Sequence, residues 1–115
     1  MTVTQQMKSA FHDDGAIKIA ALFDERQLAE CRRCFDYSVA HPSPLASDIF
    51  GGTADAHYND LGNFDNLDTY KPMLEHLGFA QLLSELWESE HVWYFGEELF
   101  IKDGGNVCRS PWHQD

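Results

Sequence analysis

The sequence predicts a single domain of the α+β class, or a piece of a larger one. Three stretches, 4–14, 24–40 and 70–88, carry apolar residues at the three- and four-residue steps of an amphipathic helix. The segment 92–115 changes to β-branched and aromatic residues interrupted by glycine, which is typical of strands. The length of 115 residues fits one hydrophobic core and hardly more.

The composition narrows the class of partner. The chain has 19 Asp and Glu against 8 Lys and Arg, a formal net charge of −11, which argues against nucleic acid and against anionic membrane surfaces. No apolar run reaches the roughly 18 residues of a membrane span. The N-terminus lacks the basic and apolar parts of a signal peptide, and 3 cysteines do not make a disulfide framework. We therefore expect a cytoplasmic protein.

Two helices are predicted in the first part of the chain. The helix over 4–14 ends where Gly15 suits a left-handed cap, and a brief strand is expected over 16–20. The helix over 24–40 opens with a capping box, in which Asp24 is the N-cap and Gln27 follows three residues later. An apolar stripe runs along this second helix and consists of Leu28, Cys31, Phe35 and Val39.

The segment 43–69 is predicted to be a long loop. It contains Pro44, the Gly51-Gly52 pair and five aspartates, and a structureless stretch of this length usually forms a lid or a binding loop. A disordered insert is the alternative. The aromatic residues in the segment favour the lid; they are Phe50, Tyr58 and Phe64.

The rest of the chain is predicted to hold helices and then strands. Pro72 suits the first turn of a helix that starts at Tyr70, and Gly78 divides the helical stretch before Phe79. Two runs of strand character follow, 92–95 and 99–101, with Gly96 between them as a bulge or turn.

The triplet His113-Gln114-Asp115 is the most informative motif. On a strand, residues two apart project to the same face, so His113 and Asp115 would point together. An imidazole and a carboxylate on one face are two arms of a facial chelate, which with a third histidine leaves open positions on Fe(II).

The surroundings of this triplet resemble a known family. The strand and glycine loop over 99–106, followed by Trp112-His113-Gln114-Asp115, resemble the phytanoyl-CoA dioxygenase family of Fe(II)/2-oxoglutarate oxygenases. The opening also resembles that family, with Phe11, Asp14-Gly15-Ala16 and Leu22-Phe23 ahead of a capped helix.

The resemblance implies a double-stranded β-helix, or jelly-roll, core flanked by N-terminal helices, with His113 and Asp115 as iron ligands. Lys102 matches a lysine that holds the 2-oxoglutarate carboxylate in some members; the alternative is a solvated charge at a strand end. Trp112 either lines the iron pocket or is core. His57 and Tyr58 in the predicted loop are candidate substrate contacts.

The chain departs from the family pattern at its end. The third iron ligand and the arginine that pairs with 2-oxoglutarate lie downstream of the triplet in that family, and this sequence stops at Asp115. The strand-like runs are also too few for a jelly roll of about eight strands. We expect an N-terminal part of one oxygenase domain, completed by a longer chain or by a partner chain.

The predicted activity is hydroxylation of an aliphatic C–H bond in a small molecule, with O2 as co-reactant. The negative charge favours a neutral or cationic substrate over a coenzyme A thioester.

One alternative is a non-catalytic binding or regulatory fragment. Another is a zinc or redox module on the cysteines, but the Cys31/Cys34 pair lies inside a helix and lacks a second pair. Cys108 could combine with His113, but Ser110-Pro111 between them favours a simple loop.

Overall fold

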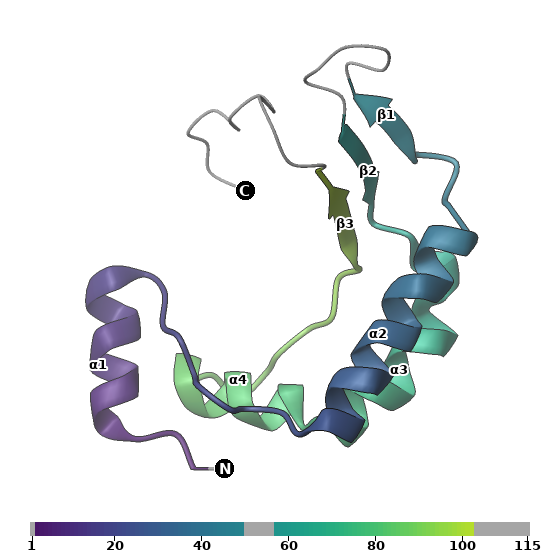
Figure 1. Ribbon diagram of the computed structural model, residues 1–115. Helices are drawn as coiled ribbons and strands as arrows, with labels where there is room; N and C mark the ends of the chain where they lie inside the picture. Colours follow the sequence, from purple (N-terminus) through teal and green to yellow (C-terminus); the bar gives the residue numbers. More distant parts are fainter. Residues whose placement is uncertain (1, 50–56, 103–115) are drawn as a thin grey trace.

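The computed structural model describes residues 2–49 and 57–102, and in these residues the fold is α+β (Figure 1). Its elements are α1 (Gln5–Asp14), α2 (Glu25–Ala40), β1 (Ser47–Ile49), β2 (His57–Leu61), the 3-10 helix η1 (Phe64–Asn66), α3 (Leu67–His76), α4 (Phe79–Trp87) and β3 (Glu98–Ile101). The strands form one antiparallel sheet in the order β1-β2-β3. Within the described ranges, no helix has the length and apolar character needed to traverse a bilayer.

The predicted ends of the first two helices are confirmed. Thr4 caps α1 through its side chain, and Gly15 takes the left-handed conformation with φ 72° while its N–H donates to the Phe11 carbonyl. At α2, Asp24 and Gln27 form both hydrogen bonds of the capping box, at 2.8 and 3.0 Å. Local sequence alone decides these ends.

The predicted apolar stripe of α2 is not the buried face of the helix. Leu28, Phe35 and Val39 are 54%, 37% and 41% exposed, whereas Cys34 and Ser38 are buried. The reason is that α3 offers hydrogen-bonding groups to this side: Cys34 Sγ donates to the Thr69 carbonyl at 3.6 Å, and the Ser38 hydroxyl lies 3.1 Å from that of Tyr70. Small polar side chains therefore line the α2–α3 contact.

The prediction of a loop over 43–69 is wrong for the described part of that segment. It contains β1, the central strand β2, η1 and the first turn of α3. Asn and Asp residues suggested turns, but on β2 they are buried and hydrogen-bonded, since Asn59 accepts from Ser47 and Asp60 accepts from Ser43. A satisfied polar side chain is compatible with a buried strand. Residues 50–56 lie outside the described residues.

Two predicted strands are absent, and one is confirmed. The segment 16–20 is irregular and leads into Ala21 at φ 51°, and Val92–Phe95 belongs to no strand within the described ranges. The run 99–101 lies in β3 as predicted. Strand propensity is not sufficient without a neighbouring strand to supply the ladder.

The predicted helical stretch 70–88 is two helices joined at Gly78, which has φ 67°. The first of them begins at Leu67 rather than at Tyr70, so Pro72 lies in the helix interior and not in its first turn. The start was misplaced because η1 leads directly into α3 through Asn66 and leaves no loop between them.

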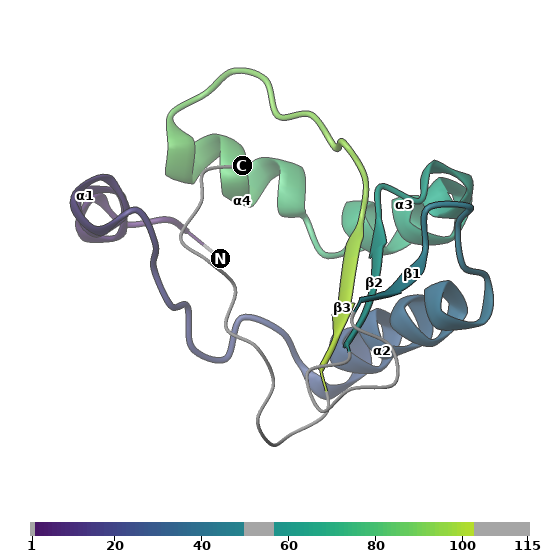
Figure 2. The same ribbon diagram turned by 90° about the horizontal axis from the view of Figure 1, so that it is seen from above.

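The elements form an open arrangement. Figures 1 and 2 show α2 and α3 side by side next to the sheet, while α1 and α4 lie together at the other end. The Cα radius of gyration is 16.4 Å, against about 13 Å for a compact chain of this length. In the described ranges the buried apolar side chains are few, and they are Val3, Cys34, Met73, Leu86 and Leu99. The apolar core is thus small and spread over both ends.

Candidate functional site

The residues predicted to form the oxygenase site fall into two groups. His113, Asp115 and Trp112 lie outside the described residues, so the iron ligands remain a prediction from the sequence. Lys102 is exposed and directly follows β3, and His57 and Tyr58 are the first two residues of β2. Among the described residues, no three His, Cys, Asp or Glu side chains are grouped to hold a metal ion.

The sheet register brings two of the predicted residues to the same end of the sheet. Tyr58 pairs with Ile101 and Asn59 with Phe100, so continuing the register by one residue sets His57 opposite Lys102. Directly opposite residues on antiparallel strands project to the same face. His57 and Lys102 therefore belong to one face, and Tyr58 belongs to the other face with Ile101.

A first group of buried polar contacts fixes β2 and the following turn to the end of α2. The Asp60 carboxylate, only 2% exposed, accepts from the Ser43 backbone N–H at 2.8 Å and from the Ser43 hydroxyl. Asn63, 4% exposed, donates to the His41 carbonyl at 2.9 Å. These contacts hold the α2–β1 connection against the central strand.

A second polar group joins the segment before β3 to the helices. Glu97 Oε1 lies 3.1 Å from the Ser38 hydroxyl and accepts from the Asn66 amide at 3.0 Å, while Oε2 accepts from the Tyr94 hydroxyl at 3.2 Å. The Asn66 amide also donates to Ser38 at 2.9 Å, and the Tyr70 hydroxyl lies 3.1 Å from Ser38. The Glu97 carboxylate thereby connects α2 and η1 to the segment before β3, and Ser38 extends the group to Tyr70 of α3.

Both tyrosines of this group stay in the neutral phenol form at neutral pH. Burial raises the pKa of Tyr94, and the adjacent Glu97 carboxylate raises that pKa further. Burial also raises the pKa of Tyr70, although the hydrogen bond with Ser38 acts in the opposite direction. A phenol that keeps its proton can donate to the carboxylate. The arrangement stabilises the position of β3 and leaves the Glu97 oxygens satisfied.

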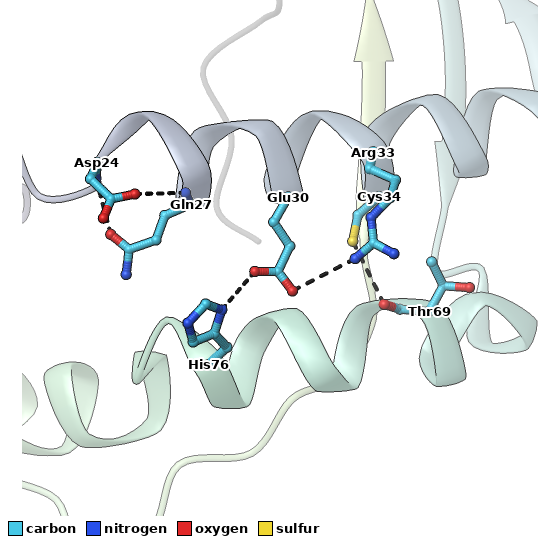
Figure 3. A network of polar contacts seen from close by, with 7 residues as sticks. All are labelled: Asp24, Gln27, Glu30, Arg33, Cys34, Thr69 and His76. Carbon is cyan, nitrogen blue, oxygen red and sulfur yellow. Dashed lines mark hydrogen bonds and ion pairs between the residues drawn. The ribbon is translucent and has the colours of Figure 1, made fainter.

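The α2–α3 contact also decides how the cysteines are interpreted (Figure 3). Cys34 is completely buried between the helices, and this burial raises the pKa of its thiol. A reactive or zinc-binding cysteine needs the thiolate, so the environment favours a packing role for Cys34. Beside it, Glu30 accepts from His76 Nδ1 at 2.7 Å and lies 3.6 Å from Arg33.

An apolar groove lies on another part of the surface, between α3, α4 and the segment that precedes β3. Its volume is about 350 Å³, and its walls include Phe79, Trp87, Trp93, Tyr94 and Phe95. Two of these rings make edge contacts with other aromatic rings. The ring centroids of Phe79 and Phe23 are 5.4 Å apart, and those of Phe95 and Phe64 are 5.6 Å apart.

Sequence reasoning missed the buried polar residues. Asp60, Asn63 and Asn66 recur at three-residue steps around Gly62, and this spacing is the only signal in the sequence that sets them apart from loop residues. The adjacent residues Glu97 and Glu98 differ in environment, because Glu97 joins the polar group and Glu98 is exposed.

No protein-family model, no curated protein and no solved structure matches this chain.

Proposed function

We propose that this chain is the N-terminal part of an Fe(II)/2-oxoglutarate-dependent oxygenase that hydroxylates an aliphatic C–H bond of a small molecule. The single observation in the structure that supports it best is the register of β2 and β3. Extended by one residue beyond the Tyr58–Ile101 pair, that register would bring the predicted co-substrate residue Lys102 opposite the predicted substrate residue His57. The two residues were selected from the sequence for separate reasons, so their common face supports the proposal.

In this proposal Lys102 binds a carboxylate of 2-oxoglutarate. The co-substrate is a dianion, and the exposed ammonium of Lys102 at the end of a strand can contact it at the protein surface. His57 on the same face would border the substrate. Glu97 lies five residues before Lys102 and ties the start of β3 to the helices, which limits how far the strand can shift.

His113 and Asp115 would hold the metal ion. Their donor atoms, one imidazole nitrogen and one carboxylate oxygen, match the ligand chemistry of the facial iron site, and a further histidine would have to come from beyond the described fold. Bound iron would supply the O2-dependent oxidation, while the protein binds and orients the organic reactants.

The jelly-roll core is part of the proposal. The described sheet has three strands, and β3 is at its edge. The aromatic side chains next to that edge are exposed, Trp93 at 87% and Phe95 at 78%. Surfaces of this kind are normally covered. Additional strands supplied by a longer chain or by a partner chain would cover them and complete the barrel.

The decisive experiment measures succinate formation from 2-oxoglutarate, coupled to substrate, in the protein that contains this chain together with the rest of the fold. We expect His113→Ala and Asp115→Ala to abolish turnover. Lys102→Met should raise KM for 2-oxoglutarate by roughly tenfold, with a smaller effect on kcat, because it removes a binding contact. Lys71→Met on the outer surface of α3 is the matched control and should leave both constants unchanged. Undiminished turnover in the His113 or Asp115 variant would refute the proposal.

A second candidate function is a non-catalytic binding or regulatory fragment of the same fold. The exposed aromatic residues Trp93 and Phe95 favour it, since such a surface binds other chains whether or not iron is present. Anaerobic calorimetry with Fe(II) and then 2-oxoglutarate separates the two functions, because only the oxygenase requires both to bind.

A further inference from the structure

The segment Val92–Gly96 has the exposure pattern of a strand although it belongs to no sheet in the described residues. Trp93 and Phe95 are 87% and 78% exposed, whereas Tyr94 between them is 40% exposed and Val92 and Gly96 are partly covered. Alternation with a period of two is the pattern of a half-buried strand. Trp93 and Phe95 are thus markedly more exposed than Tyr94 between them.

The main chain of this segment is available for pairing. Within the described residues, no backbone hydrogen bond joins Val92–Gly96 to another part of the fold, and the first such bond is from Gly62 N–H to the Glu97 carbonyl at 2.9 Å. The segment then continues directly into β3, which is the edge strand of the sheet. Figure 2 shows this stretch from α4 to β3 running along the outside of the molecule. Together Val92–Ile101 form one continuous stretch, called here the open edge.

Contacts with α2 and η1, and one contact within the segment, position the open edge before any partner binds. The Tyr94 hydroxyl donates to Glu97 at 3.2 Å, the Phe95 ring contacts that of Phe64 at 5.6 Å, and Glu97 is bonded to Ser38 and Asn66. A segment that is already positioned loses less conformational entropy when a ligand adds to it. The open edge is thus better suited to binding than a free loop of the same composition.

Charge indicates what can bind. The chain carries −11 overall; Glu98 is exposed within the open edge, and Glu90 is exposed two residues before it. A second copy of this chain would bring another −11 to the same edge, which is unfavourable. The exposed side chains of Trp93, Phe95 and Phe100 are apolar and would be covered by apolar side chains of a ligand. The complementary ligand is therefore an extended strand in which apolar and basic side chains alternate.

We propose that the open edge Val92–Ile101 binds an extended polypeptide of alternating apolar and basic residues by β-strand addition. Main-chain hydrogen bonds would provide affinity, and the aromatic side chains and acidic residues would provide selectivity. This inference deepens the proposed function in one respect, since the strands expected to cover this edge would have this alternating pattern, and it does not depend on iron binding.

The test uses the 115-residue chain and a fluorescent peptide of about ten residues that alternates lysine with valine, with binding followed by anisotropy. Three further peptides are compared: one with alternate backbone nitrogens methylated, one with the same residues grouped in two blocks, and one with glutamate in place of lysine. The protein variants are Trp93→Ser with Phe95→Ser, and Leu28→Ser on α2 as a control, since Leu28 is also exposed, at 54%.

We expect the alternating lysine peptide to bind and each of the three other peptides to bind roughly tenfold more weakly or worse. The affinity of the Trp93→Ser/Phe95→Ser variant for the alternating lysine peptide should fall by a similar factor, and that of Leu28→Ser should not change. Amides of the open edge should gain protection from hydrogen exchange in the complex. Equal affinity for the N-methylated peptide would overturn the proposal, because it would show charge attraction without strand pairing. A dimer of the free chain that masks the open edge would overturn it as well. A failure of the protein to bind iron in separate experiments would refute only the oxygenase function and would not affect the proposal of strand addition.

Discussion

The α2–α3 contact and the open edge differ in which side chains are buried and which are exposed. Between the helices, the buried positions are the small side chains Cys34 and Ser38, both with hydrogen-bond partners. Along the open edge, the large aromatic side chains of Trp93 and Phe95 are mostly exposed. The comparison shows that small side chains with hydrogen-bond partners are buried between these two helices, while large aromatic side chains stay exposed beside the edge strand of the described sheet.

The largest effect is expected from removing the carboxylate that holds β2. Asp60→Ala leaves the Ser43 N–H and hydroxyl without their buried acceptor, so the free energy of unfolding should fall by about 2–4 kcal/mol. Urea unfolding followed by circular dichroism measures it. Asp65→Ala is the control, because Asp65 in η1 is exposed, and its change should stay within about 0.5 kcal/mol. Equal stability of the two variants would contradict the view that polar contacts hold this region together.

An intermediate effect is expected from alkaline pH. Because the folded state raises the pKa of Tyr94 and Tyr70, it keeps phenol protons that the unfolded chain releases above about pH 10. The contribution is therefore fully present below that pH and is lost as the pH rises towards the folded-state pKa. The raised pKa of the Cys34 thiol acts in the same direction from a lower pH.

The measurement is the urea midpoint at several pH values between about 8 and 11. The midpoint should fall as the pH rises, and the midpoint of the double variant Tyr70→Phe/Tyr94→Phe should fall less. Tyr37→Phe is the control, since Tyr37 stacks on His41 outside this polar group, at 4.0 Å between ring centroids. An unchanged slope in the double variant would show that the phenols do not carry the pH dependence.

The smallest effect on stability is expected at the open edge. Trp93→Ser with Phe95→Ser should change the free energy of unfolding by no more than about 0.5 kcal/mol per site, because both side chains are largely exposed. Binding of a hydrophobic dye to the native chain should fall at the same time. A large loss of stability would mean that these rings belong to a closed core, and the contrast between the two regions would fail.

The features that could be predicted from sequence are those decided within a few residues. Asp24 and Gln27 are three apart, and Gly15 directly follows its helix, so the helix ends were predicted correctly. The bond from Ser43 to Asp60 spans 17 residues, and the role of β2 depends on it. No local pattern distinguishes an aspartate that meets a distant serine from one in a loop.

The same limit applies to the candidate site. The sequence identified Lys102 and His57 separately, but only the pairing of β2 with β3 relates them. Ser38 and Glu97 lie 59 residues apart, and helix periodicity alone would place Leu28 and Phe35, rather than Ser38, on the inner face. Val92–Phe95 failed as a strand for a related reason, since a strand is defined by its neighbour as well as by its own residues.

The close approach of two glycines has a consequence for the direction of the open edge. A methyl group added at Gly96 would come within 3.3 Å of the Gly62 Cα, so the two main chains touch where neither residue has a side chain. A residue with a Cβ at position 96 would require the Gly62 main chain to move by a few tenths of an ångström. The position of the segment that carries Trp93 and Phe95 thus depends on glycine at this contact.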